Sequence, residues 1–189
     1  LKPGDVLLCN DPYRVGTHVN DTCFIRPVFH NDKPVAFVNA RAHQLDMGGV
    51  TPGGFSGTKA NVYENGLVLG PMLLFENDKP LRSTFSLVFD NTRFAGLLQP
   101  DFMTMAEQLK LGEKLLLESI ERYGEAAYRG TVRYCCDVSA EAMSDAFERI
   151  PDGVYHAQES IDADGAGDDE LITIRAKIVK RSGRIEVDC

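Results

Sequence analysis

The chain has 189 residues, near the upper end of single-domain size, with 43% hydrophobic and 25% charged residues, as in ordinary globular proteins. No apolar run approaches the roughly 20 residues that span a bilayer, so we expect no membrane segment. The formal charge is -8 and no Lys/Arg cluster is longer than Lys180-Arg181, which argues against nucleic acid as a partner.

Residues 1–80 are predicted to be β-rich. Residues 48–58 hold five glycines and a proline, which predicts a long loop that either faces a substrate or is a surface excursion. The stretch from His30 to Lys33 has the composition of a hairpin turn. Runs rich in apolar and β-branched residues predict strands at 6–9, 23–29, 34–42, 62–63 and 67–75.

Residues 81–150 are predicted to be helical, with helices at 83–91, 101–123 and 140–149. Asp101 is expected to cap the long helix and Gly124 to end it. Apolar or small residues recur with helical period in the second and third helices, and we interpret both stripes as core packing. The stripes consist of Met105, Leu109, Gly112, Leu116, Ile120 and Tyr123, and of Met143, Ala146, Phe147 and Ile150.

Residues 151–189 are predicted to return to β-structure, with strands at 154–161, 171–179 and 184–188. The acidic, glycine-rich stretch 162–169 is interpreted as a solvated turn, because it lacks the final Glu and the flanking helices of a calcium loop. The fold class is therefore α+β, with mixed β-sheet segments at both ends and a central helical region. We expect the three regions to be parts of one larger subunit that continues beyond this sequence.

The cysteine pattern bears on the compartment. The sequence has an odd number of cysteines, with one adjacent pair and no CxxC motif: Cys9, Cys23, Cys135, Cys136 and Cys189. This pattern predicts neither a disulfide framework nor a zinc knuckle, and it is typical of buried thiols in a reducing compartment. We expect a cytoplasmic location.

Two His-x-x-Asp motifs carry the candidate chemistry, His18 with Asp21 and His43 with Asp46. Imidazole and carboxylate together suit a divalent transition ion, and two His with one Asp leave positions open for water or substrate. If residues 22–29 and 34–42 form a hairpin, then His18, Asp21 and His43 emerge at its open end. The alternative is that each motif is a hydrogen-bonded pair that orients a structural histidine.

Other residues are weaker candidates. Asp11, after the first strand, is either a base, a carboxylate that holds a ligand histidine, or the start of an Asx turn. His30 lies in the predicted turn and His156 alternates with strand residues, so both are interpreted as structural or exposed. The sequence contains neither a P-loop nor a G-x-S-x-G motif, so any ATP is expected to be used elsewhere.

The motifs of residues 4–53 resemble the hydantoinase B family, which includes oxoprolinase and N-methylhydantoinase B-type units and the acetone carboxylase alpha subunit. The resemblance rests on Gly4-Asp5-Val6, Asn10-Asp11-Pro12-Tyr13, Gly16-Thr17-His18, Asp21, Arg41-Ala42-His43, Asp46, Gly48-Gly49 and Thr51-Pro52-Gly53. Weaker similarity continues through most of the chain. One departure is Gln44, where many members have a second histidine; it is compatible with both branches of the family.

The resemblance implies a two-component enzyme. An actin/hexokinase-like A-type subunit uses ATP to phosphorylate an amide or enol oxygen, and the B-type part holds zinc or manganese. In the carboxylase branch of the family, the metal ligands match His18, Asp21 and His43. We take Asp11 or Asp46 as the candidate base or supporting carboxylate. We expect a hetero-oligomeric hydrolase that opens a cyclic amide (a hydantoin, 5-oxoproline or a lactam). The alternatives are a ketone carboxylase with the same ion, and a non-catalytic scaffold whose histidines only pack.

Overall fold

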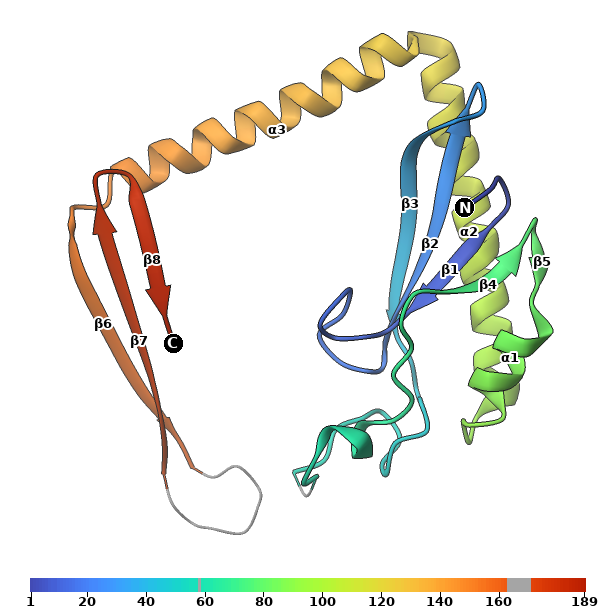
Figure 1. Ribbon diagram of the computed structural model, residues 1–189, viewed down its shortest axis with the longest axis horizontal. Helices are drawn as coiled ribbons and strands as arrows, with labels where there is room; N and C mark the ends of the chain where they lie inside the picture. The colour runs from blue at the N-terminus through green and yellow to red at the C-terminus, as the bar shows by residue number, and fades with distance from the viewer. Residues whose placement is uncertain (58, 163–170) are drawn as a thin grey trace. The chain divides into compact units, whose positions relative to one another are not determined.

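Antiparallel strand pairing organises both ends of the chain, as a computed structural model shows for residues 1–57, 59–162 and 171–189 (Figure 1). These residues divide into two units, Leu1–Ser119 and Ile120–Cys189, and each is described by itself. The predicted α+β class, with sheet at both ends and helices between, is confirmed.

The first unit contains a five-stranded sheet in the order β3-β2-β1-β4-β5. Its strands are β1 (Val6–Cys9), β2 (Asp21–His30), β3 (Lys33–His43), β4 (Met72–Glu76) and β5 (Lys79–Pro80). The predicted turn between β2 and β3 is confirmed: Asn31 and Asp32 have φ of 50° and 59°, a conformation that Asn and Asp adopt more readily than most residues. Near this turn the pairing shifts from Phe29–Pro34 to Val28–Ala36, so Val35 forms a β-bulge.

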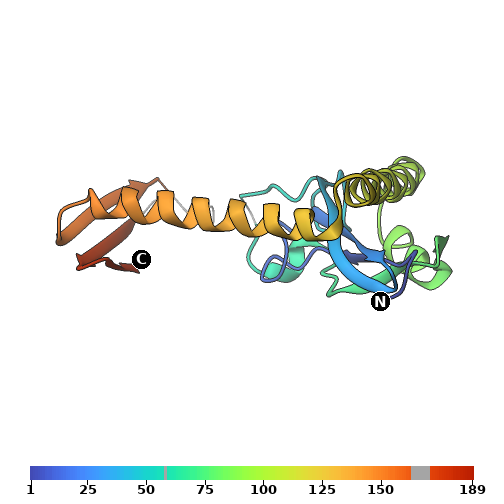
Figure 2. The same ribbon diagram turned by 90° about the horizontal axis from the view of Figure 1, so that it is seen from above.

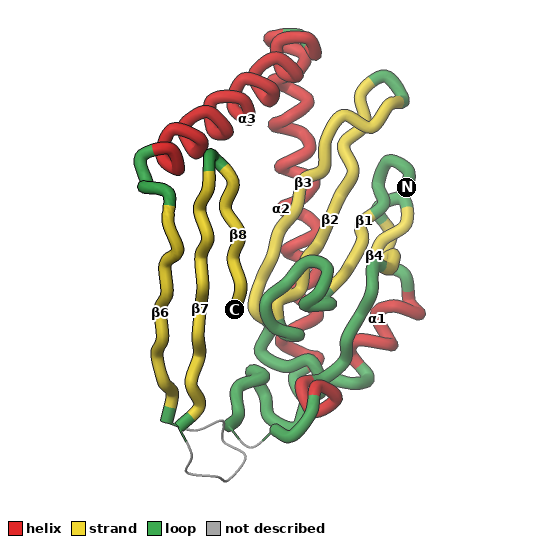
Figure 3. The backbone as a smooth tube through the Cα atoms, turned by 60° about the vertical axis from the view of Figure 1, so that its left-hand side comes forward, coloured by secondary structure: helices red, strands yellow, loops and turns green. Residues whose placement is uncertain are grey.

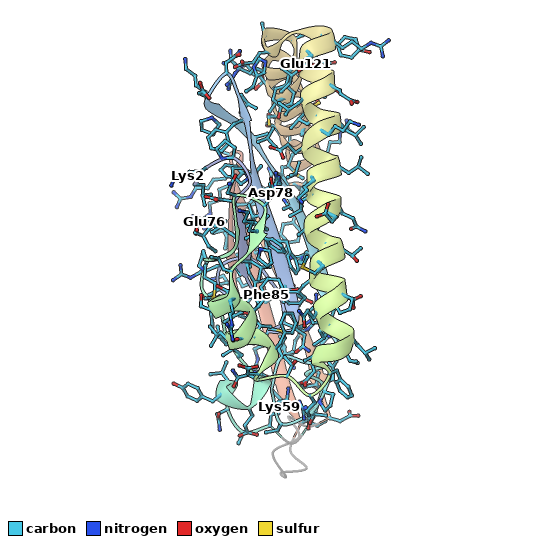
Figure 4. The ribbon with its side chains drawn as sticks, turned by 90° about the vertical axis from the view of Figure 1, so that its right-hand side faces the viewer. Lys2, Lys59, Glu76, Asp78, Phe85 and Glu121 are labelled. Carbon is cyan, nitrogen blue, oxygen red and sulfur yellow. The ribbon has the colours of Figure 1, made fainter. Side chains whose placement is uncertain are left out.

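Two helices, α1 (Arg82–Phe89) and α2 (Ala95–Tyr123), pack against one face of this sheet. The core between them is aromatic, because Phe102 of α2 makes edge-to-face contacts with Phe24 of β2 and Phe89 of α1. Figure 4 shows α2 alongside the sheet, with Phe85 of α1 labelled. The remaining core residues are Val6, Leu8, Val19, Met47, Leu69, Leu74, Phe75, Phe85, Val88, Leu98, Ala106 and Leu109.

The Thr84 hydroxyl ties α1 to the sheet by donating a hydrogen bond of 2.6 Å to the Leu73 carbonyl. We expect Thr84→Val to lower the free energy of unfolding by about 1 kcal/mol, since it leaves that carbonyl without its donor while keeping the shape of the side chain. Urea unfolding of the complete protein measures this. Thr104→Val is the matched control, because the exposed Thr104 hydroxyl bonds only to its own helix; an equal loss in both variants would contradict the prediction.

The segment between β3 and β4 differs from the prediction. Residues 62–63, predicted as a strand, belong to a 3-10 helix, η1 (Val62–Asn65), because the Asn61 side chain caps it by accepting from the Tyr63 N–H. The predicted strand 67–75 is regular only from Met72, since the buried Asn10 amide takes up the Leu67 carbonyl and the Leu69 N–H. The described part of the predicted loop 48–58 lacks helix or strand (Figure 3).

The predicted start of the long helix is wrong. α2 begins at Ala95, so Pro100 and Asp101 lie inside it and Asp101 is no cap. Leu98 and Phe102 are both fully buried, and their packing favours the earlier turn despite the proline. Gly124, with φ of 89°, separates α2 from the next helix as predicted.

The second unit contains α3 (Glu125–Glu148) and the sheet β6-β7-β8, formed by β6 (Gly153–Ile161), β7 (Ile172–Arg181) and β8 (Arg184–Asp188). α3 is one continuous helix, far longer than the predicted 140–149 (Figure 2). Its predicted burial is wrong: Met143, Phe147 and Ile150 are exposed, and so is Ala146. An apolar stripe is buried only where another surface covers it, and the described residues of the second unit leave these four side chains exposed.

Two findings complete the fold. The predicted acidic turn at 162–169 lies, except for Asp162, outside the described residues. Among the helices that the structure describes, none is both long and apolar enough to cross a membrane.

Candidate metal centre

The open end of the β2–β3 hairpin brings three potential ligands together. Asp21 begins β2 and His43 ends β3, and the two residues are paired directly across the strands. His18 lies in the preceding loop, which is anchored by its buried neighbour Val19. Ligand atoms of His18, Asp21 and His43 all lie within 4.8 Å of one another, the only such cluster of at least three His, Cys, Asp or Glu residues within the described part of the chain.

The His43 ring is oriented by hydrogen bonds at both nitrogens. Nε2 lies 3.1 Å from the Gly53 carbonyl, and Nδ1 lies 2.9 Å from a carboxylate oxygen of Asp21. A carbonyl oxygen only accepts, so Nε2 donates to Gly53. Nδ1 faces the Asp21 carboxylate and is therefore the nitrogen at which a bound cation would take the place of the hydrogen. Protein zinc sites commonly orient a ligand histidine through a carbonyl in this manner.

The Asp21 carboxylate is held in its charged form. Burial by itself would raise its pKa, but the hydrogen bond with His43 and the backbone N–H groups of His18 and Thr17 outweigh burial and hold the pKa below its usual value. The backbone bonds measure 3.1 Å from His18 and 3.2 Å from Thr17. An ionised carboxylate beside two imidazoles is a donor set that suits zinc or manganese.

Buried amides hold the two ligand-bearing segments together. The fully buried Asn20 donates to the Gln44 carbonyl at 2.8 Å, and the Gln44 N–H donates to the Asn20 carbonyl at 2.7 Å. The Gln44 side chain in turn donates to the Thr22 hydroxyl at 2.7 Å. The buried Gln44 therefore helps to hold these two segments together. Its side chain faces away from the ligand cluster, since successive residues along an extended chain point to opposite sides.

The loop after β3 folds back over the ligands. The Phe55 ring lies 5.2 Å from the His18 ring and 5.5 Å from the His43 ring, centroid to centroid, and remains 67% exposed. With the Gly53 carbonyl on His43, the loop thus provides both an apolar wall and an orienting acceptor. This contact fits the predicted role of a loop that faces a substrate.

Gly54 allows this loop to approach Asn20. Its φ is +75°, and an added Cβ would lie 2.4 Å from the Asn20 side-chain oxygen. We expect Gly54→Ala to displace the Gly53 carbonyl and to weaken metal binding about tenfold, the range seen when an outer-shell partner is lost. Metal titration of the complete protein tests this. Gly57→Ala is the control, because its Cβ would meet nothing within 4 Å; equal affinities in the two variants would contradict the expectation.

Asp46 lies outside the ligand cluster. Its fully buried carboxylate accepts hydrogen bonds from the Arg93 backbone N–H, from the Arg93 guanidinium and from the Gly48 N–H. The Arg93 side chain also donates to the Gly49 carbonyl at 2.6 Å. The hydrogen bonds from Arg93 lower the pKa of Asp46 to about 2 despite its burial. This ion pair fixes the start of the loop that reaches His43.

Asp11 is likewise not among the clustered ligands. Its carboxylate accepts from the Tyr13 N–H at 3.0 Å, which is an Asx turn, and from the Arg14 side chain at 2.9 Å. The turn geometry therefore accounts for Asp11, and a catalytic role for it stays a prediction.

Three contributors to the site were not predicted. Arg93 is 47 positions from Asp46, and nothing in the local sequence of either residue indicates their pairing. Gly53 and Phe55 lie within the predicted loop, but composition alone does not say which of its residues turns inward. The signal available was the glycine pattern around Phe55, which indicates close backbone approach without naming the partner.

A family model for hydantoinase B/oxoprolinase matches residues 1–189. The chain belongs to the hydantoinase B/oxoprolinase family. Over 179 residues it is 28% identical to the caprolactamase subunit beta of Pseudomonas jessenii, a match that covers 94% of this chain and 31% of that protein. It is 26% identical over 189 residues to the acetophenone carboxylase delta subunit of Aromatoleum aromaticum, which covers 100% of this chain and 28% of that one.

A solved structure agrees with these relatives. The crystal structure of the ATP-dependent caprolactamase from Pseudomonas jessenii matches 99% of this chain with a TM-score of 0.87 at 26% identity, and the match covers 32% of that chain. The hydantoinase B/oxoprolinase chain described here thus spans about a third of the length of the curated relatives that it matches. The family indicated by the motifs is confirmed.

Proposed function

We propose that this chain is the metal-binding part of a B-type subunit in an ATP-dependent hydrolase that opens a cyclic amide: a hydantoin, 5-oxoproline or a lactam. The convergence of His18, Asp21 and His43 within 4.8 Å carries the proposal. The caprolactamase relatives support an amide as substrate.

In this proposal the three ligands hold zinc or manganese, which when bound supplies Lewis acidity toward a carbonyl or water. Asp21 provides the negative charge, and the Gly53 carbonyl keeps the His43 ring in place. Of the roles proposed for Asp46, its salt bridge to Arg93 favours the supporting one over that of a base, since its oxygens are already occupied by donors. Asp11 remains a candidate base in this proposal.

The proposed assembly is a hetero-oligomer in which an A-type, actin/hexokinase-like subunit uses ATP. The caprolactamase relative is named as a subunit beta, which supports a multi-subunit assembly. A cytoplasmic location belongs to the same proposal, and it is supported by five cysteines that are all free thiols in this structure.

A ketone carboxylase is the second candidate function. It is favoured by the acetophenone carboxylase relative, which covers the whole chain. The same ligand cluster serves either reaction, because polarising a carbonyl is common to both. A scaffold without catalysis is the third candidate, and it requires that the cluster bind no ion.

The test uses the complete protein with its A-type partner. Elemental analysis is expected to find zinc or manganese, and ATP is expected to drive ring opening of 5-oxoproline, a hydantoin or caprolactam. Carbon dioxide fixation with acetone or acetophenone and bicarbonate would instead assign the carboxylase. Absence of bound metal, together with full activity of His18→Ala, would contradict both and leave the scaffold.

A further inference from the structure

The face of the five-stranded sheet opposite α1 and α2 carries the ligand cluster at one end and a groove beside it. Asp21 and His43 lie on this face, and because side chains alternate along a strand, so do the residues two and four positions further along. The groove has a volume of about 960 Å³. Its lining includes Leu7, Cys23, Ile25, Phe37, Asn39 and Arg41.

Arg41 stands between the ligand cluster and the apolar part of this groove. It pairs with Cys23, two positions along the strands from the Asp21–His43 pair, which is a separation of roughly 7 Å. Its guanidinium donates one hydrogen bond, of 3.0 Å, to the Val15 carbonyl in the loop that leads to His18. Among the residues that the structure describes, no carboxylate lies within salt-bridge distance of it.

A guanidinium that has no carboxylate partner among the described residues, and that lies next to an apolar wall, is suited to bind an amphipathic anion. The guanidinium fork binds carboxylate and phosphoryl oxygens with two hydrogen bonds, and one used donor leaves the others available. Small-molecule sites combine a mainly apolar lining with a few fixed polar groups, and Leu7, Ile25 and Phe37 provide that lining here.

We propose that Arg41 and this groove form the subsite that holds a substrate oxyanion and its apolar body while the reacting carbonyl faces His18, Asp21 and His43. The inference rests on the proposed function and narrows its substrate class. The substrate is a small molecule with an apolar part and a carboxylate or phosphoryl group a few bonds from the carbonyl. The roughly 7 Å between the Arg41 pair and the ligand pair sets that spacing.

The test measures binding of small probes to the complete protein by calorimetry, with and without zinc or manganese. Phenylacetate and phenyl phosphate carry the two kinds of oxyanion, and phenylacetamide is the neutral comparison. Arg41→Gln removes the charge, Arg41→Lys keeps the charge without the fork, and Arg184→Gln is a charge-matched control on β8. Circular dichroism verifies that each variant is folded.

Arg41→Gln is expected to weaken binding of the preferred oxyanion about tenfold and to leave phenylacetamide unchanged, with Arg41→Lys between the two and Arg184→Gln like the wild type. The tighter of the two anionic probes identifies the natural group as carboxylate or phosphoryl. Unchanged binding of both anions to a folded Arg41→Gln protein that retains its metal would overturn the subsite alone. Arg41-dependent binding by a protein that takes up no metal would support the subsite and reject the proposed function.

Discussion

Replacing His43 by alanine in the complete protein is expected to lower zinc or manganese affinity more than 100-fold and to abolish the ATP-dependent reaction. The loss exceeds the roughly 10- to 100-fold effect of removing an outer-shell group, because His43 supplies a ligand atom and also joins Asp21 to the Gly53 carbonyl. Competition with a metal chelator measures the affinity, and elemental analysis measures the remaining metal.

His156→Ala is the matched control for this variant. His156 lies on β6 in the second unit, is exposed, and is not part of the ligand cluster. The His156→Ala protein is expected to have the same metal content as the wild type. A His43→Ala protein that binds metal as tightly as the wild type would show that the three side chains do not act as a ligand set.

Asp46→Asn is expected to lower the free energy of unfolding at neutral pH by about 2 kcal/mol, because the charged hydrogen bonds from Arg93 are lost at a fully buried site. The direction in which this stabilisation changes with pH follows from the folded-state pKa of Asp46, which is about 2, compared with the ordinary aspartate pKa of 3.8. The unfolded chain takes up the proton first, so this stabilisation is present above about pH 4 and is lost as the pH falls toward 2.

Urea unfolding of the wild type and of Asp46→Asn between pH 6 and pH 2, in the same buffers, measures this contribution. The difference between the two proteins is expected to shrink as the pH falls through that window. Asp101→Asn serves as control, because Asp101 is exposed on α2 and its replacement removes a carboxylate without breaking a buried pair. A constant difference between wild type and Asp46→Asn at every pH would contradict the assignment.

The clustering of His18, Asp21 and His43 could be predicted because each of its parts has a local signal. The turn residues Asn31 and Asp32 define the hairpin, and the two His-x-x-Asp motifs flank it at similar distances. Antiparallel pairing then brings Asp21 opposite His43. The motif spacing does not predict that the two aspartates have different surroundings. Asp21 is part of the cluster, whereas the buried Asp46 pairs with Arg93.

The other features of the fold and the site depend on tertiary packing, which no local sequence pattern predicts. Arg93 lies beyond α1, so its pairing with Asp46 follows from the whole core. The start of α2 cannot be read from the local pattern, because buried Leu98 and Phe102 outweigh the proline between them. For α3 the sequence contains a clear apolar stripe, but periodicity indicates only which side of a helix favours burial and not what covers it.

Val35, the unpaired residue of the bulge in β3, makes the hairpin tolerant of one particular change in length. β2 and β3 pair in one register between the bulge and the turn, and in another register between the bulge and the Asp21–His43 pair. A deletion at Val35 would close the bulge and keep the two ligands opposite each other. A deletion between Thr22 and Val28 would bring Asp21 to the other side of the sheet, because a slip of one residue reverses every side chain. Homologous hairpins of different length are therefore expected to vary at the turn and bulge and to keep a constant number of residues beyond it.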